Sequence, residues 1–278
     1  MKNKNELIQI LVNSGLERNE AAIEIELILE NILNKTREEL LFINEFDEKE
    51  ILPVVLERAN LRCPVQYILK NANFMGENYY VDENVLIPRD ETELLVREVF
   101  KYLSDGIKIL DIGTGSGIIA CSLGLFSKKR GFKIEVLGVD ISNAALNIAI
   151  NNMKKLNLTR TCLFRKSDIF SNIREDEKFD IIVSNPPYIP KNQFETIQKE
   201  VKFEPYNALF TDDEDGLYFY KKIIKETPKF LNKKGFIFYE MMKGQHIEIS
   251  KILSENGFYN IEIVKDMQGI ERVIKAQI

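Results

Sequence analysis

The sequence predicts an open α/β sheet with helices on both faces, preceded by a small all-helical domain and joined to it by a β-hairpin. From about residue 107 onward, short apolar runs alternate with helical patterns, as expected where strands and helices follow one another in an open sheet. The residues before position 72 carry apolar side chains at helical spacing only. A chain of 278 residues suits one large domain with a smaller one.

The amino-terminal segment is predicted to be helical, with two recognisable helix starts. Thr36 with Glu39, and Asp47 with Glu50, each match a capping box ahead of an apolar run. Pro53 lies early in the second of these helices, where a proline is tolerated only in the first turn. Acidic residues outnumber basic ones here, which is typical either of a solvated helical face or of a surface for a basic protein partner.

Short β-type runs between positions 73 and 88 are broken by Gly76 and by an Asp-Glu-Asn turn, which predicts a hairpin. We therefore expect a helical domain at residues 1–72, a hairpin linker at 73–88 and an α/β domain at 89–278. Strands of the sheet are expected at "IKILDIG", "KIEVLGVD", "TCLFRKSD", "FDIIVSNPP", "FIFYEM", "YNIEIVKD" and "ERVIKAQI". The helices between them include "SNAALNIAINNMKKL" and "GLYFYKKIIKETPKFL".

Composition excludes several classes of function. No apolar run has transmembrane length and no apolar signal segment follows Met1, so we expect a cytoplasmic protein without a membrane partner. Cys63, Cys121 and Cys162 form no paired spacing and are interpreted as small buried apolar groups. His246 is the only histidine, which argues against a histidine metal site and a Ser-His-Asp triad. The net charge of -5 argues against a large phosphate-binding surface.

The first predicted strand of the sheet runs into a glycine-rich loop, where the backbone can turn tightly and approach a ligand closely. The spacing is GxGxG, so it matches neither the dinucleotide fingerprint nor a Walker loop. A purely structural turn is the alternative. The candidate cofactor-binding residues of this loop are Asp111, Gly113, Thr114, Gly115, Ser116 and Gly117.

Two further strand ends carry carboxylates, and ligands of such sheets bind beyond the carboxyl ends of the strands. Asp140 can accept hydrogen bonds from both hydroxyls of an adenosine ribose, or it can merely cap the next helix. Asp168 can accept from an adenine amino group, with Ile169 or Phe170 against the ring, or it can belong to an ordinary turn. Together with the glycine loop, these strand ends predict an adenosine ligand without a phosphate cradle, namely S-adenosylmethionine.

The fourth strand ends in Asn185-Pro186-Pro187-Tyr188, a pattern suited to a planar amino group. The side-chain oxygen of Asn185 and the backbone carbonyl of Pro186 can accept its two hydrogens, while the prolines fix the backbone. The ring of Tyr188 can pack on the flat substrate. Positioning then supplies much of the rate, and no dedicated base is required. The alternative is a sharp exit of the strand into a loop.

In this order, the glycine loop, Asp140 and the NPPY motif resemble those of amino-group methyltransferases. "LRCPVQYIL", "VLIPRDETELL" and "DMQGIERVI" are similar to stretches of the protein-(glutamine-N5) methyltransferases that act on peptide chain release factors, over essentially the whole chain. The resemblance implies a Rossmann-like S-adenosylmethionine-dependent methyltransferase sheet. It also implies methylation of the glutamine N5 in the Gly-Gly-Gln motif of class 1 release factors, with S-adenosylhomocysteine as product and the helical domain docking the substrate.

Two other functions stay open. A nucleic-acid amino-group methyltransferase, acting on adenine N6 or guanine N2, should carry a basic extra domain, whereas this one is acidic; we expect no direct nucleic-acid partner and no metal. A non-catalytic adenosyl-ligand binding module would not need NPPY. The sequence departs from the family pattern at Asp90, Cys63 and Ile169. Whether Glu91 and Glu93 contact substrate or only begin a solvated helix also stays open.

Overall fold

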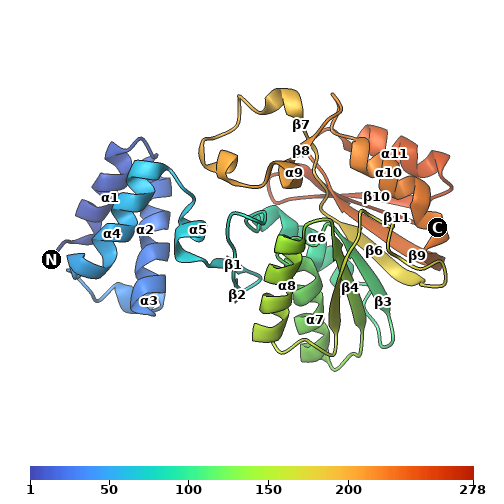
Figure 1. Ribbon diagram of the computed structural model, residues 1–278, viewed down its shortest axis with the longest axis horizontal. Helices are drawn as coiled ribbons and strands as arrows, with labels where there is room; N and C mark the ends of the chain where they lie inside the picture. The colour runs from blue at the N-terminus through green and yellow to red at the C-terminus, as the bar shows by residue number, and fades with distance from the viewer. The chain divides into compact units, whose positions relative to one another are not determined.

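The computed structural model describes residues 1–278 and divides them into two compact units (Figure 1). The first unit holds residues Met1–Asn71 together with Gln198–Phe203, and the second holds Ala72–Ile197 and Glu204–Ile278. The sequence pattern predicts that positions 198–203 belong to the α/β domain. The structure corrects this, because the short segment packs with the helices of the first unit.

The first unit is built from helices, as the apolar spacing predicts. Its helices are α1 (Lys4–Asn13), α2 (Arg18–Leu33), α3 (Arg37–Leu40), α4 (Glu48–Leu61), α5 (Val65–Leu69) and the 3-10 turn η2 (Glu200–Phe203). The predicted capping box of Thr36 and Glu39 is confirmed. The second box is wrong, since Asp47 accepts the backbone N–H of Lys49 at 3.0 Å instead. Helix α4 nevertheless begins at Glu48 and continues past Pro53.

A buried arginine holds the 198–203 segment in the first unit. The side chain of Arg58 is fully buried and donates to the carboxylate of Glu24 at 2.7 and 2.8 Å and to Glu200 at 3.3 Å. Arg62 donates to the same Glu200 oxygen at 2.6 Å. A buried charge is tolerated only when it is paired and hydrogen-bonded. Glu200 therefore ties a segment far along the chain to helix α4.

The second unit contains a seven-stranded sheet with the order β10-β11-β9-β6-β3-β4-β5. All seven predicted strands are present: β3 (Lys108–Ile112), β4 (Glu135–Asp140), β5 (Cys162–Lys166), β6 (Phe179–Ser184), β9 (Leu231–Glu240), β10 (Tyr259–Lys265) and β11 (Glu271–Gln277). The pairs β5–β4, β4–β3, β3–β6 and β6–β9 are parallel, and β11 and β10 add antiparallel pairs. Functional side chains at the ends of the parallel strands thus meet at one edge.

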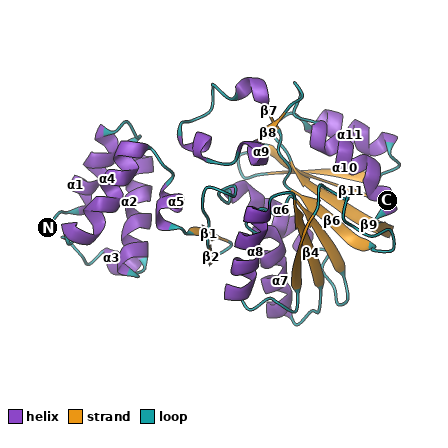
Figure 2. Ribbon diagram, viewed as in Figure 1, coloured by secondary structure: helices purple, strands orange, loops and turns teal.

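Helices cover both faces of this sheet (Figure 2). One face carries α6 (Asp90–Phe100), α7 (Ile118–Arg130) and α8 (Asn143–Lys155), and the other carries α10 (Tyr218–Glu226) and α11 (His246–Glu255). Neighbouring residues of β6 show the division: Ile181 packs in the core with α6 and α7, and Ile182 in the core with α10 and α11. Burial on both faces explains why the parallel strands read as continuous apolar runs.

The predicted hairpin is shorter than expected. Strands β1 (Ala72–Phe74) and β2 (Glu77–Tyr79) pair around Met75 and Gly76, both of which have positive φ, as a two-residue hairpin turn demands. The expectation that the hairpin reaches position 88 is wrong. A turn in which Asp82 accepts the N–H of Asn84 at 2.9 Å ends the extended backbone, and the following residues form a loop.

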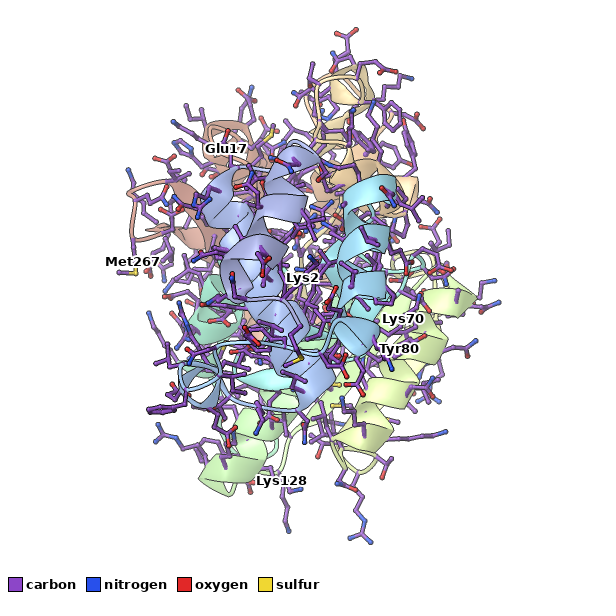
Figure 3. The ribbon with its side chains drawn as sticks, turned by 90° about the vertical axis from the view of Figure 1, so that its left-hand side faces the viewer. Lys2, Glu17, Lys70, Tyr80, Lys128 and Met267 are labelled. Atoms are coloured by element: carbon purple, nitrogen blue, oxygen red, sulfur yellow. The ribbon has the colours of Figure 1, made fainter.

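The chain between β6 and α10 leaves the sheet and forms small elements of its own. They are β7 (Ile189–Pro190), η1 (Lys191–Gln193), α9 (Tyr206–Leu209) and β8 (Phe210–Thr211), and the turn η3 (Thr227–Lys229) follows α10. Strand β7 pairs with β8 in parallel. Met267, in the turn between β10 and β11, is fully exposed and points away from the chain (Figure 3). No helix combines the length and the apolar character that crossing a bilayer requires.

Candidate active site

A cavity of about 260 Å³ lies in the second unit, at the carboxyl ends of the parallel strands. Residues that follow β3, β4, β5 and β6 line it, as expected for an open α/β sheet. Segments 84–86 and 205–208 and helix α10 contribute the remainder of the wall. Of the predicted site residues, the cavity is lined by Gly113, Gly115, Asp140, Asp168, Ile169, Asn185, Pro186 and Pro187.

The glycine loop forms one wall through Gly113 and Gly115, which have φ values of 72° and 55°. Gly117 has a different task. Its φ is 81°, and a Cβ there would lie 3.0 Å from the Cβ of Ala149 and 3.1 Å from the ring of Phe164. Only a glycine lets the start of α7 pack this closely against its neighbours. Gly117 therefore shapes the loop from outside the cavity.

Asp111, Thr114 and Ser116 also lie outside the cavity wall. The Thr114 hydroxyl donates to Asp111 Oδ2 at 2.6 Å, and the Ser116 carbonyl accepts from the side chain of Asn152 at 2.9 Å. Asp111 is fully buried, and burial raises the pKa of its carboxyl to about 7. These residues hold the loop in shape, and any direct contact with a cofactor stays a prediction.

Asp140 lines the cavity and fixes the glycine loop at the same time. Its Oδ2 accepts the backbone N–H of Gly115 at 2.9 Å, and its Oδ1 accepts that of Ser142 at 2.9 Å. The cap of α8 is Ser142, whose hydroxyl accepts the N–H of Ala145 at 3.2 Å. The capping role considered for Asp140 thus belongs to Ser142. Burial raises the pKa of Asp140 above its usual range.

The end of β5 presents Asp168 and Ile169 to the cavity but not Phe170. Asp168 lies 3.2 Å from Lys222 Nζ. Ile169 has a φ of 53°, which is rare for a β-branched residue, and its carbonyl accepts from the Ser167 hydroxyl at 2.8 Å. Phe170 instead stacks on Phe230 in the core, with ring centroids 4.6 Å apart. Of the two apolar contacts expected for a ligand ring, only Ile169 is available.

The NPPY segment divides between the cavity and the core. Asn185, Pro186 and Pro187 line the cavity, whereas Tyr188 is absent from its wall. The Tyr188 hydroxyl donates to Glu240 Oε1 at 3.4 Å, and burial raises the pKa of Tyr188. The structure thus places Tyr188 where it supports the motif, and its packing against a substrate stays a prediction.

A threonine from another element orients the carboxamide of Asn185. The Nδ2 of Asn185 donates to Thr92 Oγ1 at 3.2 Å, which leaves Oδ1 available as an acceptor. Thr92 lies in α6, is 1% exposed, and sits on a helix that packs against β9 and β11. Local sequence patterns assign no role to Thr92, and they do not predict one for Glu240. A glutamate directly at the end of the apolar run "FIFYEM" was the available signal.

The far side of NPPY is held by a glutamine and a glycine. Gln245 Nε2 donates to the carbonyl oxygens of Tyr188 and Gly216, each at 3.3 Å. Gly216 has a φ of 69°, and a Cβ there would lie 2.2 Å from the carbonyl oxygen of Tyr188. No other residue type permits this approach, so the loop before α10 fixes the backbone of the motif.

The acidic start of α6 is engaged rather than simply solvated. Glu91 pairs with Arg272 at 3.2 Å, and Glu93 Oε1 accepts the backbone N–H of Met75 at 2.9 Å. The first contact joins α6 to β11, and the second joins it to the hairpin turn. No cluster of three or more His, Cys, Asp or Glu side chains has the spacing of a metal site.

Comparisons with known proteins show that the chain resembles methyltransferases. Residues 103–275 match the model of a methyltransferase domain family. The chain is 38% identical to a release factor glutamine methyltransferase of Fusobacterium nucleatum subsp. nucleatum over 281 residues, covering 98% of this chain and 77% of that protein. It is 36% identical to one of Clostridium botulinum, covering 92% and 91%.

Among solved structures, a methyltransferase from Pyrococcus furiosus has the same fold, with a TM-score of 0.54 and 17% identity over 83% of this chain and 98% of that one. An identity of 17% shows a shared fold and no more. The two release factor glutamine methyltransferases are far more similar in sequence and match nearly the whole chain. The protein belongs to the release factor glutamine methyltransferase family.

Proposed function

We propose that this protein transfers a methyl group from S-adenosylmethionine to the side-chain nitrogen N5 of the glutamine in the Gly-Gly-Gln motif of class 1 release factors, leaving S-adenosylhomocysteine. The observation that carries this proposal is the hydrogen bond from Asn185 Nδ2 to Thr92. It leaves the Asn185 side-chain oxygen free to accept at the cavity that Asp140 and the glycine loop also line. Family membership supports the same substrate.

The cavity residues fit the methyl donor. Asp140 retains acceptor capacity beyond its two backbone contacts, as ribose hydroxyls require. The backbone at Gly113 and Gly115 permits close approach, and Asp168 with Ile169 offers an acceptor beside an apolar wall for the adenine. When bound, S-adenosylmethionine supplies an electrophilic methyl group on a sulfonium sulfur.

The residues of NPPY supply orientation. The lone pair of an amide nitrogen is delocalised, so the nitrogen is a poor nucleophile. Asn185 Oδ1 and the Pro186 carbonyl would accept the two amide hydrogens and aim the nitrogen, and positioning of this kind contributes much of a catalysed rate. The methylated amide nitrogen sheds a proton readily, so the chain needs no dedicated base.

The helical unit would dock the release factor. A lone glutamine side chain carries too little information for the cavity to select one site among many, so a second contact must supply selectivity. The first unit is a compact body with its own core, and every cavity-lining residue belongs to the second. Exposed apolar side chains on the first unit, such as Leu41 and Phe42 at 73% and 87% exposure, are candidate contacts. A substrate of this kind places the reaction in the cytoplasm.

The substrate is tested by incubating the full-length protein with labelled methyl donor and one acceptor at a time. The acceptors are a whole release factor, the same factor with its Gly-Gly-Gln glutamine replaced by alanine, and RNA. We expect label only in the unmodified factor. Label in RNA with none in the factor would contradict the proposal. It would favour the alternative function, methylation of an amino group in nucleic acid.

Docking is tested by a Leu41→Ser/Phe42→Ser double variant, which leaves the core intact because both side chains are exposed. The double variant should lower kcat/KM for whole release factor and leave kcat/KM for a short Gly-Gly-Gln peptide unchanged. Only the larger substrate loses binding energy from contacts remote from the reacting group. Ile247→Ser, at an exposed position of the second unit, is the matched control. Equal kcat/KM for the double variant and the control would remove these two residues from docking.

A further inference from the structure

A buried glutamate lies directly beside the NPPY motif. Glu240 ends β9, which pairs with β6 so that Tyr239 is opposite Ser184. Glu240 follows Tyr239 and Asn185 follows Ser184, so these two residues lie side by side at the same edge of the sheet. Glu240 is 2% exposed, and its Oε2 has no hydrogen-bond partner. A buried carboxyl oxygen without a hydrogen-bond partner lowers the stability of the folded state. We therefore expect Glu240 to have a role other than packing.

The hydroxyl of Thr92 lies between this carboxyl and Asn185. It accepts from Asn185 Nδ2 at 3.2 Å. It is also close enough to Glu240 to oppose the effect of burial on the pKa of the carboxyl. Tyr188 donates to the other oxygen of Glu240 at 3.4 Å. Asn185, Thr92, Glu240 and Tyr188 thus lie together at the carboxyl edge of the sheet.

The direction of these hydrogen bonds depends on the charge of Glu240. A hydroxyl has one proton and two lone pairs, whereas an ionised carboxylate only accepts. If Thr92 donates its proton to the free oxygen of an ionised Glu240, it has only lone pairs to offer Asn185. The carboxamide must then turn its NH₂ toward Thr92 and its Oδ1 toward the cavity. A protonated Glu240 can donate instead, and this constraint on Thr92 disappears.

We propose that Glu240 is a positioning residue, which acts through the hydroxyl of Thr92 to hold the side-chain oxygen of Asn185 toward the substrate. The inference rests on the proposed function, in which that oxygen accepts a hydrogen of the glutamine amide. Glu240 itself lies outside the cavity wall, and its effect on the reaction passes through two other side chains.

The surroundings of Glu240 make this arrangement sensitive to pH. Burial raises the pKa of Glu240 to about 7, the hydroxyls of Thr92 and Tyr188 and the Arg272 guanidinium lower it, and Glu91 raises it. Tyr220 also faces the residue and donates to its backbone carbonyl at 2.8 Å. Protonation below about pH 7 should release Asn185, so turnover should fall as the pH drops through this range.

The test is Glu240→Gln, which keeps the shape of the side chain and gives it a donor. We expect kcat on release factor to fall about 10- to 100-fold, as for the loss of one preorganised polar contact. The KM for the methyl donor should stay within about threefold. The decline of kcat below about pH 7 should vanish. Glu98→Gln is the matched control, because Glu98 is also buried and lies on the same helix as Thr92, and it should keep the wild-type pH profile.

Thr92 supplies a second route to the same answer. Thr92→Val removes the hydroxyl at constant shape and should match Glu240→Gln, while Thr92→Ser should retain most of the activity. The double variant Thr92→Val/Glu240→Gln should be no worse than either single change, because residues in one network are not additive. Fully additive losses, or an unchanged pH profile in Glu240→Gln, would overturn the proposal.

A readout that needs no catalysis separates this inference from the proposed function. The side-chain NH₂ resonances of Asn185 in ¹⁵N-labelled protein should shift between pH 6 and 8 in the wild type and stay constant in Glu240→Gln. If the wild type methylates no release factor, the proposed function fails on its own. If those resonances do not move with pH in the wild type, the coupling between Glu240 and Asn185 is absent.

Discussion

The carboxylate of Asp140 accepts the backbone N–H of Gly115 at 2.9 Å. This contact joins the ends of two neighbouring parallel strands, because Asp140 ends β4 and Gly115 lies in the loop that follows β3. The same carboxylate faces the cavity. One side chain thus holds the glycine loop in place and presents an acceptor to a ligand.

Asp140→Ala should weaken binding of S-adenosylmethionine by about 1.5–3 kcal/mol, the range for hydrogen bonds to a charged group. Isothermal titration calorimetry on the purified variant measures this. The control is Asp180→Ala, which also removes a carboxylate that accepts a backbone N–H, that of Lys108 at 2.9 Å, but lies outside the cavity. Equal donor affinity in the two variants would mean that Asp140 only braces the loop.

Asn185→Ala should lower turnover at least about 10²-fold, comparable to the loss of a preorganised donor in other active sites. The side chain faces the cavity and makes one hydrogen bond, to Thr92, so the fold and the donor affinity should change little. Steady-state kinetics with whole release factor and calorimetry with the donor separate the two effects. Asn78→Ala, at an exposed position of the hairpin, is the control. An Asn185→Ala variant within a few-fold of the wild type would remove Asn185 from the mechanism.

Asp111 should make stability depend on pH. Its pKa is raised from 3.8 to about 7 by burial, so the folded state holds a proton that the unfolded state loses at lower pH. The stabilisation from this proton is fully present below about pH 3.8 and is lost as the pH rises toward 7. We expect the Tm of the wild type to fall between pH 5 and pH 8.

Asp111→Asn, which cannot ionise, is the reference for that measurement. Its Tm should fall less over the same range, because one of the buried carboxyls is gone, while Glu240, with a pKa of about 7, still contributes. Thermal unfolding followed by circular dichroism in matched buffers measures both proteins. Identical slopes of Tm against pH for the two would show that Asp111 does not carry this dependence.

Gly216→Ala should disturb the NPPY backbone. The added Cβ would lie 2.2 Å from the Tyr188 carbonyl oxygen at a residue with a φ of 69°, so either the loop or the motif must move. We expect a loss of stability of more than about 1 kcal/mol, the usual cost of such a backbone position for a residue with a Cβ, and a clear fall in turnover.

Gly244→Ala is the matched control for that change. Gly244 has a φ of 90°, and a Cβ there meets no atom within 4 Å. Gly244→Ala therefore introduces the backbone strain without a steric clash like the one with the Tyr188 carbonyl oxygen. Chemical denaturation and steady-state turnover should show a larger loss for Gly216→Ala in both. If the two variants behave alike, close packing at Gly216 does not position the motif.

The sequence by itself determined the strands of the sheet, the glycine loop and the place of Asn185 at a strand end. These features depend on neighbouring residues: apolar runs define buried strands, glycines permit tight turns, and Pro186 ends a ladder. The capping box of Thr36 and Glu39 was predictable for the same reason, because both partners lie within one turn of helix.

Only the tertiary structure decided which side chains meet. Thr92 and Asn185 lie 93 positions apart in the sequence, and Arg58 and Glu200 lie 142 positions apart. The spacing of neighbouring residues therefore cannot predict either contact. The choice of Ile169 over Phe170 for the cavity depends on a backbone turn with positive φ, which spacing cannot reveal for an isoleucine. Strand periodicity places a residue at an edge of the sheet, but the packing of a distant helix decides which way its side chain points and what it can bind.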